Sequence, residues 1–179
     1  MKPFEFIDSI NIDTIANKFS LYNDWHNPYS MMRQASYFVH QDTDTIPLMW
    51  SLESLKNFPA HEQAPKTEYW EKYFDQSFFD ELFNIINSYK KGYPVRILFA
   101  LLRPAGWIGP HTDSGESLRI NSRIHLPIIT NEQVFFSVGG ETIYMKPGEI
   151  YEINNQLEHE VANDSSEDRI HLVIDWHGE

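Results

Sequence analysis

Apolar residues in the second half of the chain recur in short runs that are separated by turn residues. Gly139-Gly140 sits between two of these runs and is a two-residue hairpin signal. Strands at such regular spacing, without helices between them, predict a mainly β sandwich or jelly roll. The predicted strands cover residues 95–103, 119–130, 134–138, 141–145, 147–153 and 169–176.

The first half of the chain has a mixed pattern. Residues 35–40 have the aromatic and β-branched content of a strand, and the turn-rich stretch 42–45 follows them. One helix is predicted from Ser77, a possible N-cap, to Tyr89, because its apolar residues recur on one face. Helix-stop signals follow at residues 90–94. We expect this helix to pack on the outside of the sheet.

The chain has 179 residues and no linker, repeat or low-complexity segment, so we expect one domain over residues 1–179. Residues 1–94 would supply supporting helices and strands, and residues 95–179 would form the β core. The predicted fold is a jelly roll of the cupin type with flanking helices.

Composition narrows the classes of partner. The net charge is −12 and is divided evenly between the two halves, which argues against nucleic acid and anionic membranes as partners. The absence of cysteine excludes disulfides, thiolate metal sites and a cysteine nucleophile. No apolar segment resembles a signal peptide or a membrane span, so a cytoplasmic location is expected.

One His-x-Asp pair stands in a context that suits metal binding. His111 and Asp113 follow a Gly/Pro-rich bend, and in extended backbone residues two apart point to the same face. His159 would complete a set of two imidazoles and one carboxylate, which suits non-heme Fe(II) with a chelating cosubstrate. Spacing alone does not select this pair, because His40/Asp42 and His177/Glu179 match it too.

Arginines accompany the proposed ligands. The alternation over 119–130 puts Arg119, Asn121, Arg123 and His125 on one strand face, which is either a solvated exterior or a polar cavity for an anion. Arg169 opens the apolar last strand. It would pair with acidic neighbours on the surface or, facing inward, with the carboxylate of a dicarboxylate cosubstrate.

Five sequence elements together carry a family resemblance. They are Pro110-His111-Thr112-Asp113, Arg123-Ile124-His125-Leu126, Gly148-Glu149-Ile150, Glu158-His159-Glu160-Val161 and Arg169 with Leu172-Val173-Ile174-Asp175. Over about residues 95–176 they resemble the aspartyl/asparaginyl β-hydroxylase-like Fe(II)/2-oxoglutarate dioxygenases.

The resemblance implies a double-stranded β-helix core that holds the metal and cosubstrate site within residues 95–179. Residues 1–94 would then form a wall of the substrate pocket. The resemblance implies His111, Asp113 and His159 as iron ligands, with no further catalytic residue. It also implies that Arg169 holds the distal carboxylate of 2-oxoglutarate.

The same resemblance places Arg123 and His125 near the iron-chelating end of the cosubstrate. The animal aspartyl hydroxylase has glycine at the position of Asp113, and a serine where Ala100 stands here. The acid at position 113 and the spacing to Arg123 look more like the proline cis-hydroxylase branch of the family.

The resemblance therefore implies hydroxylation of an amino acid or of an amino-acid residue, aspartyl/asparaginyl or prolyl. Molecular oxygen and 2-oxoglutarate would be consumed, the latter by decarboxylation to succinate. Two alternatives stay open: a non-catalytic cupin-like module that binds a metal or small ligand, and a different outcome at the same iron, such as desaturation or oxygen sensing.

Overall fold

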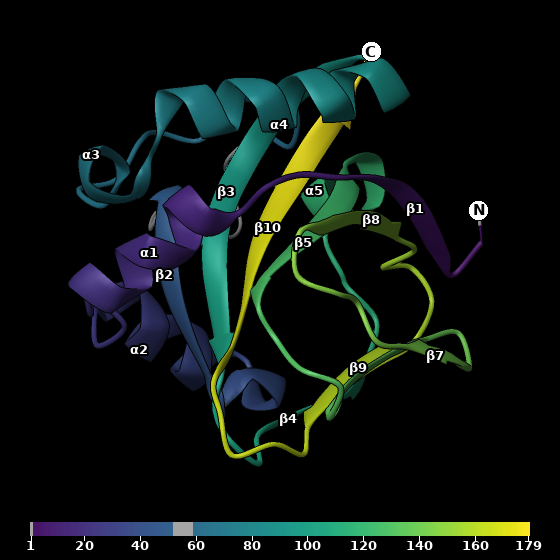
Figure 1. Ribbon diagram of the computed structural model, residues 1–179. Coiled ribbons are helices and arrows are strands. Elements are labelled where there is room, and N and C mark those ends of the chain that lie inside the picture. The colour runs from purple at the N-terminus through teal and green to yellow at the C-terminus, as the bar shows by residue number, and fades with distance from the viewer. Residues whose placement is uncertain (1, 52–58) are drawn as a thin grey trace.

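Two antiparallel sheets form the centre of the molecule, and helices surround the larger sheet (Figure 1). The computed structural model describes residues 2–51 and 59–179. The strands are β1 (Phe4–Ser9), β2 (Thr43–Met49), β3 (Gly92–Leu102), β4 (Trp107–His111), β5 (Ser122–Ile129), β6 (Val134–Val138), β7 (Glu141–Ile143), β8 (Glu149–Ile153), β9 (His159–Asn163) and β10 (Arg169–Gly178).

The larger sheet has the strand order β1-β8-β5-β10-β3-β2, and the smaller sheet has the order β4-β9-β6-β7. This mainly β arrangement with flanking helices confirms the predicted jelly-roll class. The helices are α1 (Asp13–Leu21), α2 (Pro28–Ser36), the 3-10 helix η1 (Phe38–His40), α3 (Trp70–Tyr73), α4 (Gln76–Tyr89) and α5 (Glu116–Ile120). In the described part of the chain, no helix is long and apolar enough to cross a membrane.

Alternation along the central strands separates an apolar face from a polar one. On β10, Ile170, Leu172, Ile174 and Trp176 belong to the main core, which the helices cover. The residues between them lie on the opposite face of the strand, toward the smaller sheet. They are Arg169, His171, Val173 and Asp175, all of them buried. The inner face of the larger sheet is therefore buried but charged, and it is this face that the site uses.

The prediction for residues 35–45 was wrong. Residues 35–40 are not extended: α2 continues to Ser36, and η1 covers Phe38–His40. The expected turn at 42–45 is instead the start of β2, which pairs with β3 from Thr43 onward. The apolar character of this segment misled the prediction because Phe38 is 82% exposed and does not pack in a sheet.

Several element boundaries also differ from those predicted: for example, β7 ends at Ile143 and β8 begins at Glu149. The N-cap of α4 is Asp75 rather than Ser77, since the Asp75 carboxylate accepts a hydrogen bond from the Phe78 N–H at 3.0 Å. The expected strand over 119–130 begins only at Ser122, because α5 occupies Glu116–Ile120. Arg119 is therefore helical and does not share a strand face with Arg123 and His125.

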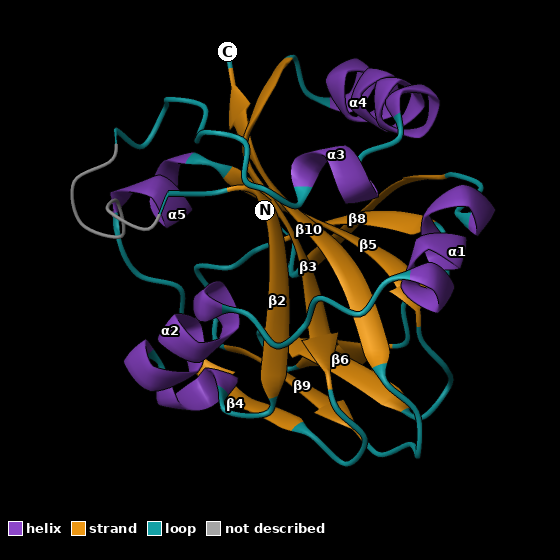
Figure 2. Ribbon diagram, turned by 90° about the vertical axis from the view of Figure 1, so that its left-hand side faces the viewer, coloured by secondary structure: helices purple, strands orange, loops and turns teal. Residues whose placement is uncertain are grey.

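Helix α2 and η1 lie against the edge of the larger sheet, beside β2 and close to β4 (Figure 2). Asn27 caps α2 by accepting from the Ser30 N–H at 3.0 Å, and Pro28 occupies its first turn. The same asparagine donates to the carbonyl of Thr45 at 2.7 Å, which fixes the start of α2 to β2. This attachment orients the inner side of α2 toward the space between the sheets.

Candidate active site

The three residues proposed as metal ligands lie together at one end of the smaller sheet. His111 ends β4 and pairs in register with His159 at the start of β9. Asp113 follows two residues after His111. Its Oδ1 is 3.9 Å from Nε2 of His111 and 4.0 Å from Nε2 of His159, and the three ligand atoms lie within 4.8 Å of one another.

Backbone carbonyls orient both imidazoles. Nδ1 of His111 lies 2.8 Å from the Gly109 carbonyl oxygen, and Nδ1 of His159 lies 2.9 Å from that of Leu157. A carbonyl can only accept, so we assign the proton of each ring to Nδ1. Each Nε2 then presents a lone pair toward Asp113, which is the arrangement that metal-ligating histidines adopt.

Asp113 is held as a carboxylate. Its Oδ2 accepts from the Asn155 side-chain amide at 3.1 Å and forms an ion pair with Nη1 of Arg123 at 3.0 Å. Burial alone would raise the pKa of Asp113, but Arg123, His159 and the Asn155 hydrogen bond outweigh it and lower that pKa. Oδ1 stays directed at the two histidines.

These donors fit a divalent iron ion. Two neutral imidazoles and one carboxylate on one face leave positions open for further ligands, as in non-heme Fe(II) oxygenases. No fourth histidine, cysteine or acid joins the cluster among the described residues. The other His-x-Asp pair is used differently: Asp42 accepts from the backbone N–H of Trp107 at 3.1 Å, and Nε2 of His40 faces Arg33 at 3.2 Å.

Asp175 links two of the arginines behind this cluster. Arg123 forms an ion pair with Asp175 at 3.0 Å, and Arg96 forms another at 2.8 Å. One end of the Arg123 guanidinium therefore contacts Asp113, and the other end contacts Asp175. Through these contacts Arg123 connects β5 both to β10 and to the candidate ligand Asp113. Its contacts favour a role in positioning the ligand carboxylate, whereas direct contact with a cosubstrate stays a prediction.

Arg169 lies in a second cluster, with His171 and His125. Its Nη2 donates to Nδ1 of His171 at 2.7 Å, and Nδ1 of His125 lies 3.4 Å from that same atom. Burial lowers the pKa of Arg169 to about 9, and burial with the nearby Arg169 charge holds the pKa of both histidines well below the usual range. The cluster thus carries one positive charge.

Several polar atoms of this second cluster have no partner in the described part of the chain: Arg169 Nε, His171 Nε2 and His125 Nε2. No carboxylate lies within ion-pair distance of Arg169 among the described residues. Buried polar groups are normally hydrogen-bonded, so unsatisfied ones in a cationic cavity indicate a polar, anionic ligand. The carboxylates of 2-oxoglutarate have that chemistry.

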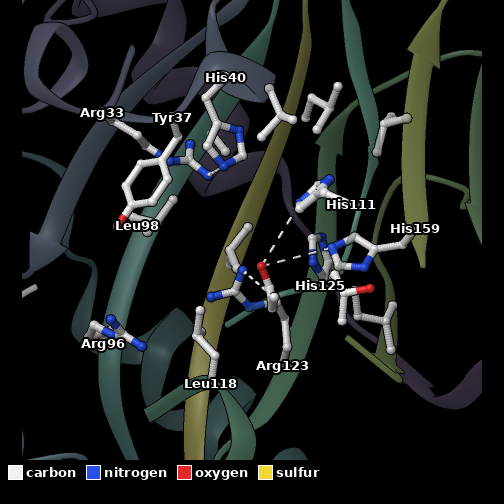
Figure 3. Close-up of a pocket in the computed structure, with 18 of the residues that line it drawn as sticks. Arg33, Tyr37, His40, Arg96, Leu98, His111, Leu118, Arg123, His125 and His159 are labelled. Atoms are coloured by element: carbon white, nitrogen blue, oxygen red, sulfur yellow. Dashed lines mark hydrogen bonds and ion pairs between the residues drawn. The ribbon is translucent and has the colours of Figure 1, made fainter. Parts of the chain in front are cut away.

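The three candidate ligands line one cavity of about 170 Å³ with His125 and Arg169, between the sheets and α2 (Figure 3). Sequence reasoning missed two further arginines of its lining. Arg33 comes from α2, which was not predicted, and Arg96 lies on the inner face of β3. His171 and Asp175 contact the lining arginines from behind, and alternation along β10 was the available signal for them, because it puts them on the same face as Arg169.

Comparison with known proteins agrees with this geometry. A sequence model of the family described as aspartyl/asparaginyl beta-hydroxylase matches residues 74–178, which is more than half of the chain. The chain belongs to this family. The hydroxylase is therefore an oxidoreductase that uses Fe(II), 2-oxoglutarate and molecular oxygen, and the alternative of a non-catalytic binding module is set aside.

Solved structures show the same fold at low sequence identity. An oxidoreductase of the 2OG-Fe(II) oxygenase family from Burkholderia pseudomallei aligns with a TM-score of 0.54 and 13% identity over 94% of this chain and 90% of its own. A viral collagen prolyl hydroxylase from Paramecium bursaria Chlorella virus-1, in complex with 2OG, aligns with a TM-score of 0.53 and 12% identity over 98% and 95% of the two chains. No curated protein sequence matches the hydroxylase.

Proposed function

We propose that the hydroxylase acts on an amino acid, free or within a peptide, with His111, Asp113 and His159 as the iron ligands. The observation that carries this proposal is the convergence of two Nε2 atoms and one carboxylate oxygen in a cavity that also contains Arg169, a buried cation with no carboxylate partner among the described residues. A metal site and an anion site in one cavity are what a metal-chelating dicarboxylate cosubstrate requires.

The reaction couples two oxidations. With Fe(II) bound, molecular oxygen oxidises 2-oxoglutarate to succinate and carbon dioxide, and its second oxygen atom enters a C–H bond of the substrate as a hydroxyl group. The chain's own residues bind and orient the reactants. Arg169 holds the distal carboxylate of 2-oxoglutarate, because a guanidinium matches a carboxylate with two parallel hydrogen bonds.

Other side chains in the cavity position these groups. Arg123 and Asn155 keep Asp113 in one orientation, so that Oδ1 alone is available to the metal. His125 lies beside the cosubstrate site as a neutral ring. Ile108, Val161 and Phe136 form an apolar wall of the same cavity, which restricts water around the reacting atoms.

A substrate screen tests the proposal. The protein, reconstituted anaerobically with Fe(II), is supplied with 2-oxoglutarate, oxygen and either a free L-amino acid or a short peptide that contains aspartate, asparagine or proline. We expect one compound class to stimulate succinate formation and to gain one oxygen atom by mass spectrometry. Succinate that never exceeds the substrate-free level, with no oxygenated product, would contradict it. The His159→Ala variant is the control for adventitious iron chemistry.

A further inference from the structure

Arg33 is a second cation of the cavity that the proposed reaction leaves without a partner. It projects from α2 toward the space between the sheets, where Figure 3 shows it beside His40. Its Nη1 donates to the Thr45 hydroxyl at 3.0 Å, and its Nη2 contacts Nε2 of His40 at 3.2 Å. Both contacts are to neutral groups, and no ion pair of Arg33 exists within the described ranges.

Two of the other cavity arginines do have carboxylate partners. Arg96 and Arg123 share two carboxylates, those of Asp175 and Asp113. Four guanidinium groups therefore face two carboxylates among the described residues of this region, and two positive charges remain, on Arg33 and Arg169. Burial lowers the pKa of Arg33 to about 10, so it is still protonated at neutral pH.

The wall around Arg33 offers hydrogen-bond donors without acceptors. A guanidinium only donates, so Nε2 of His40 accepts from Arg33 and the ring proton must be on Nδ1. That Nδ1–H is buried and has no partner in the described part of the chain. An unpartnered buried N–H beside a guanidinium that has no carboxylate among the described residues indicates an anion-binding site.

The cosubstrate does not satisfy Arg33. In the proposed function, one carboxylate of 2-oxoglutarate binds Arg169 and the other end chelates the metal. Arg33 and His40 lie apart from His125 and His159 in the cavity, and the His40 ring centroid is 5.8 Å from that of His111 (Figure 3). A group bound at Arg33 and His40 is thus next to the metal cluster. The charge of Arg33 also helps to lower the pKa of Arg169 and of His125, so the test below measures 2-oxoglutarate binding as well.

We propose that Arg33, with His40 Nδ1–H, binds a carboxylate of the substrate to be hydroxylated. The substrate is then a small molecule with a free carboxylate, such as a free amino acid, rather than an internal residue of a peptide backbone whose carboxyl is in an amide bond. This inference rests on the proposed function, because it takes the metal and the 2-oxoglutarate sites as assigned there.

The test is a thermodynamic cycle between the ligand carboxylate and Arg33. The protein is loaded with Mn(II) and 2-oxoglutarate, so that ligands bind without turnover. It is then titrated by calorimetry with each free L-amino acid and with the corresponding carboxamide. The proteins compared are the parent, Arg33→Met, Arg33→Lys and a control, Arg103→Met. Arg103 forms a half-exposed ion pair with Asp44 and does not line the cavity, so the control removes one positive charge elsewhere.

For at least one amino acid we expect the free acid to bind the parent about tenfold or more tightly than the amide, since a charge-assisted pair is lost. Arg33→Met should reduce the binding of the acid to that of the amide and leave the amide unchanged. Arg33→Lys keeps the charge but not the paired geometry, so its affinity for the acid should lie between the affinities of the parent and of Arg33→Met. Arg103→Met should match the parent.

Three results would overturn the proposal: equal binding of acid and amide, binding of neither by the parent, or an acid preference that survives in Arg33→Met. A rise in the Kd of 2-oxoglutarate equal to that of the amino acid would also overturn it, because Arg33 would then serve the cosubstrate. If Arg33→Met does not melt cooperatively, Arg33→Lys decides, and an undiminished preference overturns the proposal. Failure of the proposed function is a separate result, namely no succinate formation with Fe(II).

Discussion

The Nδ1 protons of His111 and His159 are committed to backbone carbonyls, so each ring can offer only its Nε2 to a metal. Rings fixed in this way need no reorientation when the ion binds, which raises affinity. At the scale of single residues, the site is therefore organised before any ligand arrives.

We predict that His159→Ala will weaken Fe(II) binding by at least about tenfold, since one of three ligands is removed and a metal-ligand contact contributes more than a typical hydrogen bond. Anaerobic titration with Fe(II) and competition with a chelator measure the loss. His40→Gln is the matched control, because Nε2 of His40 contacts Arg33 and His40 is not part of the ligand cluster, so parental iron affinity is expected. Iron held equally by His159→Ala and the parent would refute the ligand assignment.

Arg169 tests the cosubstrate site in the same way. We predict that Arg169→Lys will raise the Kd of 2-oxoglutarate about tenfold or more, because hydrogen bonds to charged groups contribute about 1.5–3 kcal/mol each. Iron affinity should stay unchanged, since Arg169 lies in the cluster of His171 and His125 rather than among the ligands. The charge-transfer absorption of the Fe(II)–2-oxoglutarate complex follows the titration, and superimposable curves would place the anchor elsewhere.

At the scale of elements, a buried carboxylate joins α4 to the larger sheet. Glu152 on β8 is fully buried and accepts from Lys90 Nζ at 2.7 and 2.9 Å and from the Tyr89 hydroxyl at 2.8 Å. Both partners stand at the C-terminal end of α4. These contacts of Glu152 therefore fix where α4 ends on the sheet, and the residues that make them do not line the cavity.

We predict that Glu152→Ala will lower the free energy of unfolding by about 3 kcal/mol, the lower end for breaking a buried ion pair, because Lys90 keeps some exposure. Urea denaturation measures the change. Glu5→Ala is the control: its pair with Lys2 is exposed and 3.9 Å long, so a loss below about 1 kcal/mol is expected. Equal losses in both variants would show that the Glu152 cluster contributes little.

The elements also show where sequence patterns suffice and where they fail. The long strands β3 and β10 were predictable because apolar residues line their helix-facing side throughout. Strands β4 and β9, which carry the ligands, have five residues each, and nothing in the sequence gives the register that puts His111 opposite His159. The ligand set was predicted from the His-x-Asp spacing and from the family resemblance, and the structure brings the three predicted residues together.

Pairing between distant segments determines the remaining part of the site. Arg33 reaches the cavity because Asn27 attaches α2 to β2, a contact across eighteen residues that no local periodicity encodes. Similarly, Asn155 contacts Asp113 only because the loop after β8 passes the end of β4. Such contacts are properties of the packed molecule and lie beyond local pattern analysis.

At the scale of the whole molecule, an acidic chain surrounds a cationic interior. The net charge is −12, yet the described residues of the cavity include two arginines without carboxylate partners. Buried unpaired charges destabilise a fold, and ligands of opposite charge relieve that cost. Ligand binding should therefore increase global stability.

We predict that Mn(II) and then 2-oxoglutarate, each at about one hundred times its Kd, will each stabilise the protein by roughly 2.7 kcal/mol. In a chain of this size each increment corresponds to a rise in Tm of about 5–10 °C. Thermal melting with the metal alone, and then with both ligands, measures the two increments. Arg169→Lys, at the same ligand concentrations, should keep the metal increment and lose about half or more of the second; a full second increment in that variant would contradict the assignment of Arg169.

The position of α2 and η1 has a consequence for how specificity can diversify. These elements form the wall that carries Arg33 and His40, and they precede residue 74, where the family match begins. With Arg33 bound to the substrate as proposed above, recognition of the substrate would be encoded by a stretch of the chain that precedes the one supplying the proposed iron ligands. Exchange of the earlier stretch between relatives would then change the substrate preference while the iron site stayed intact.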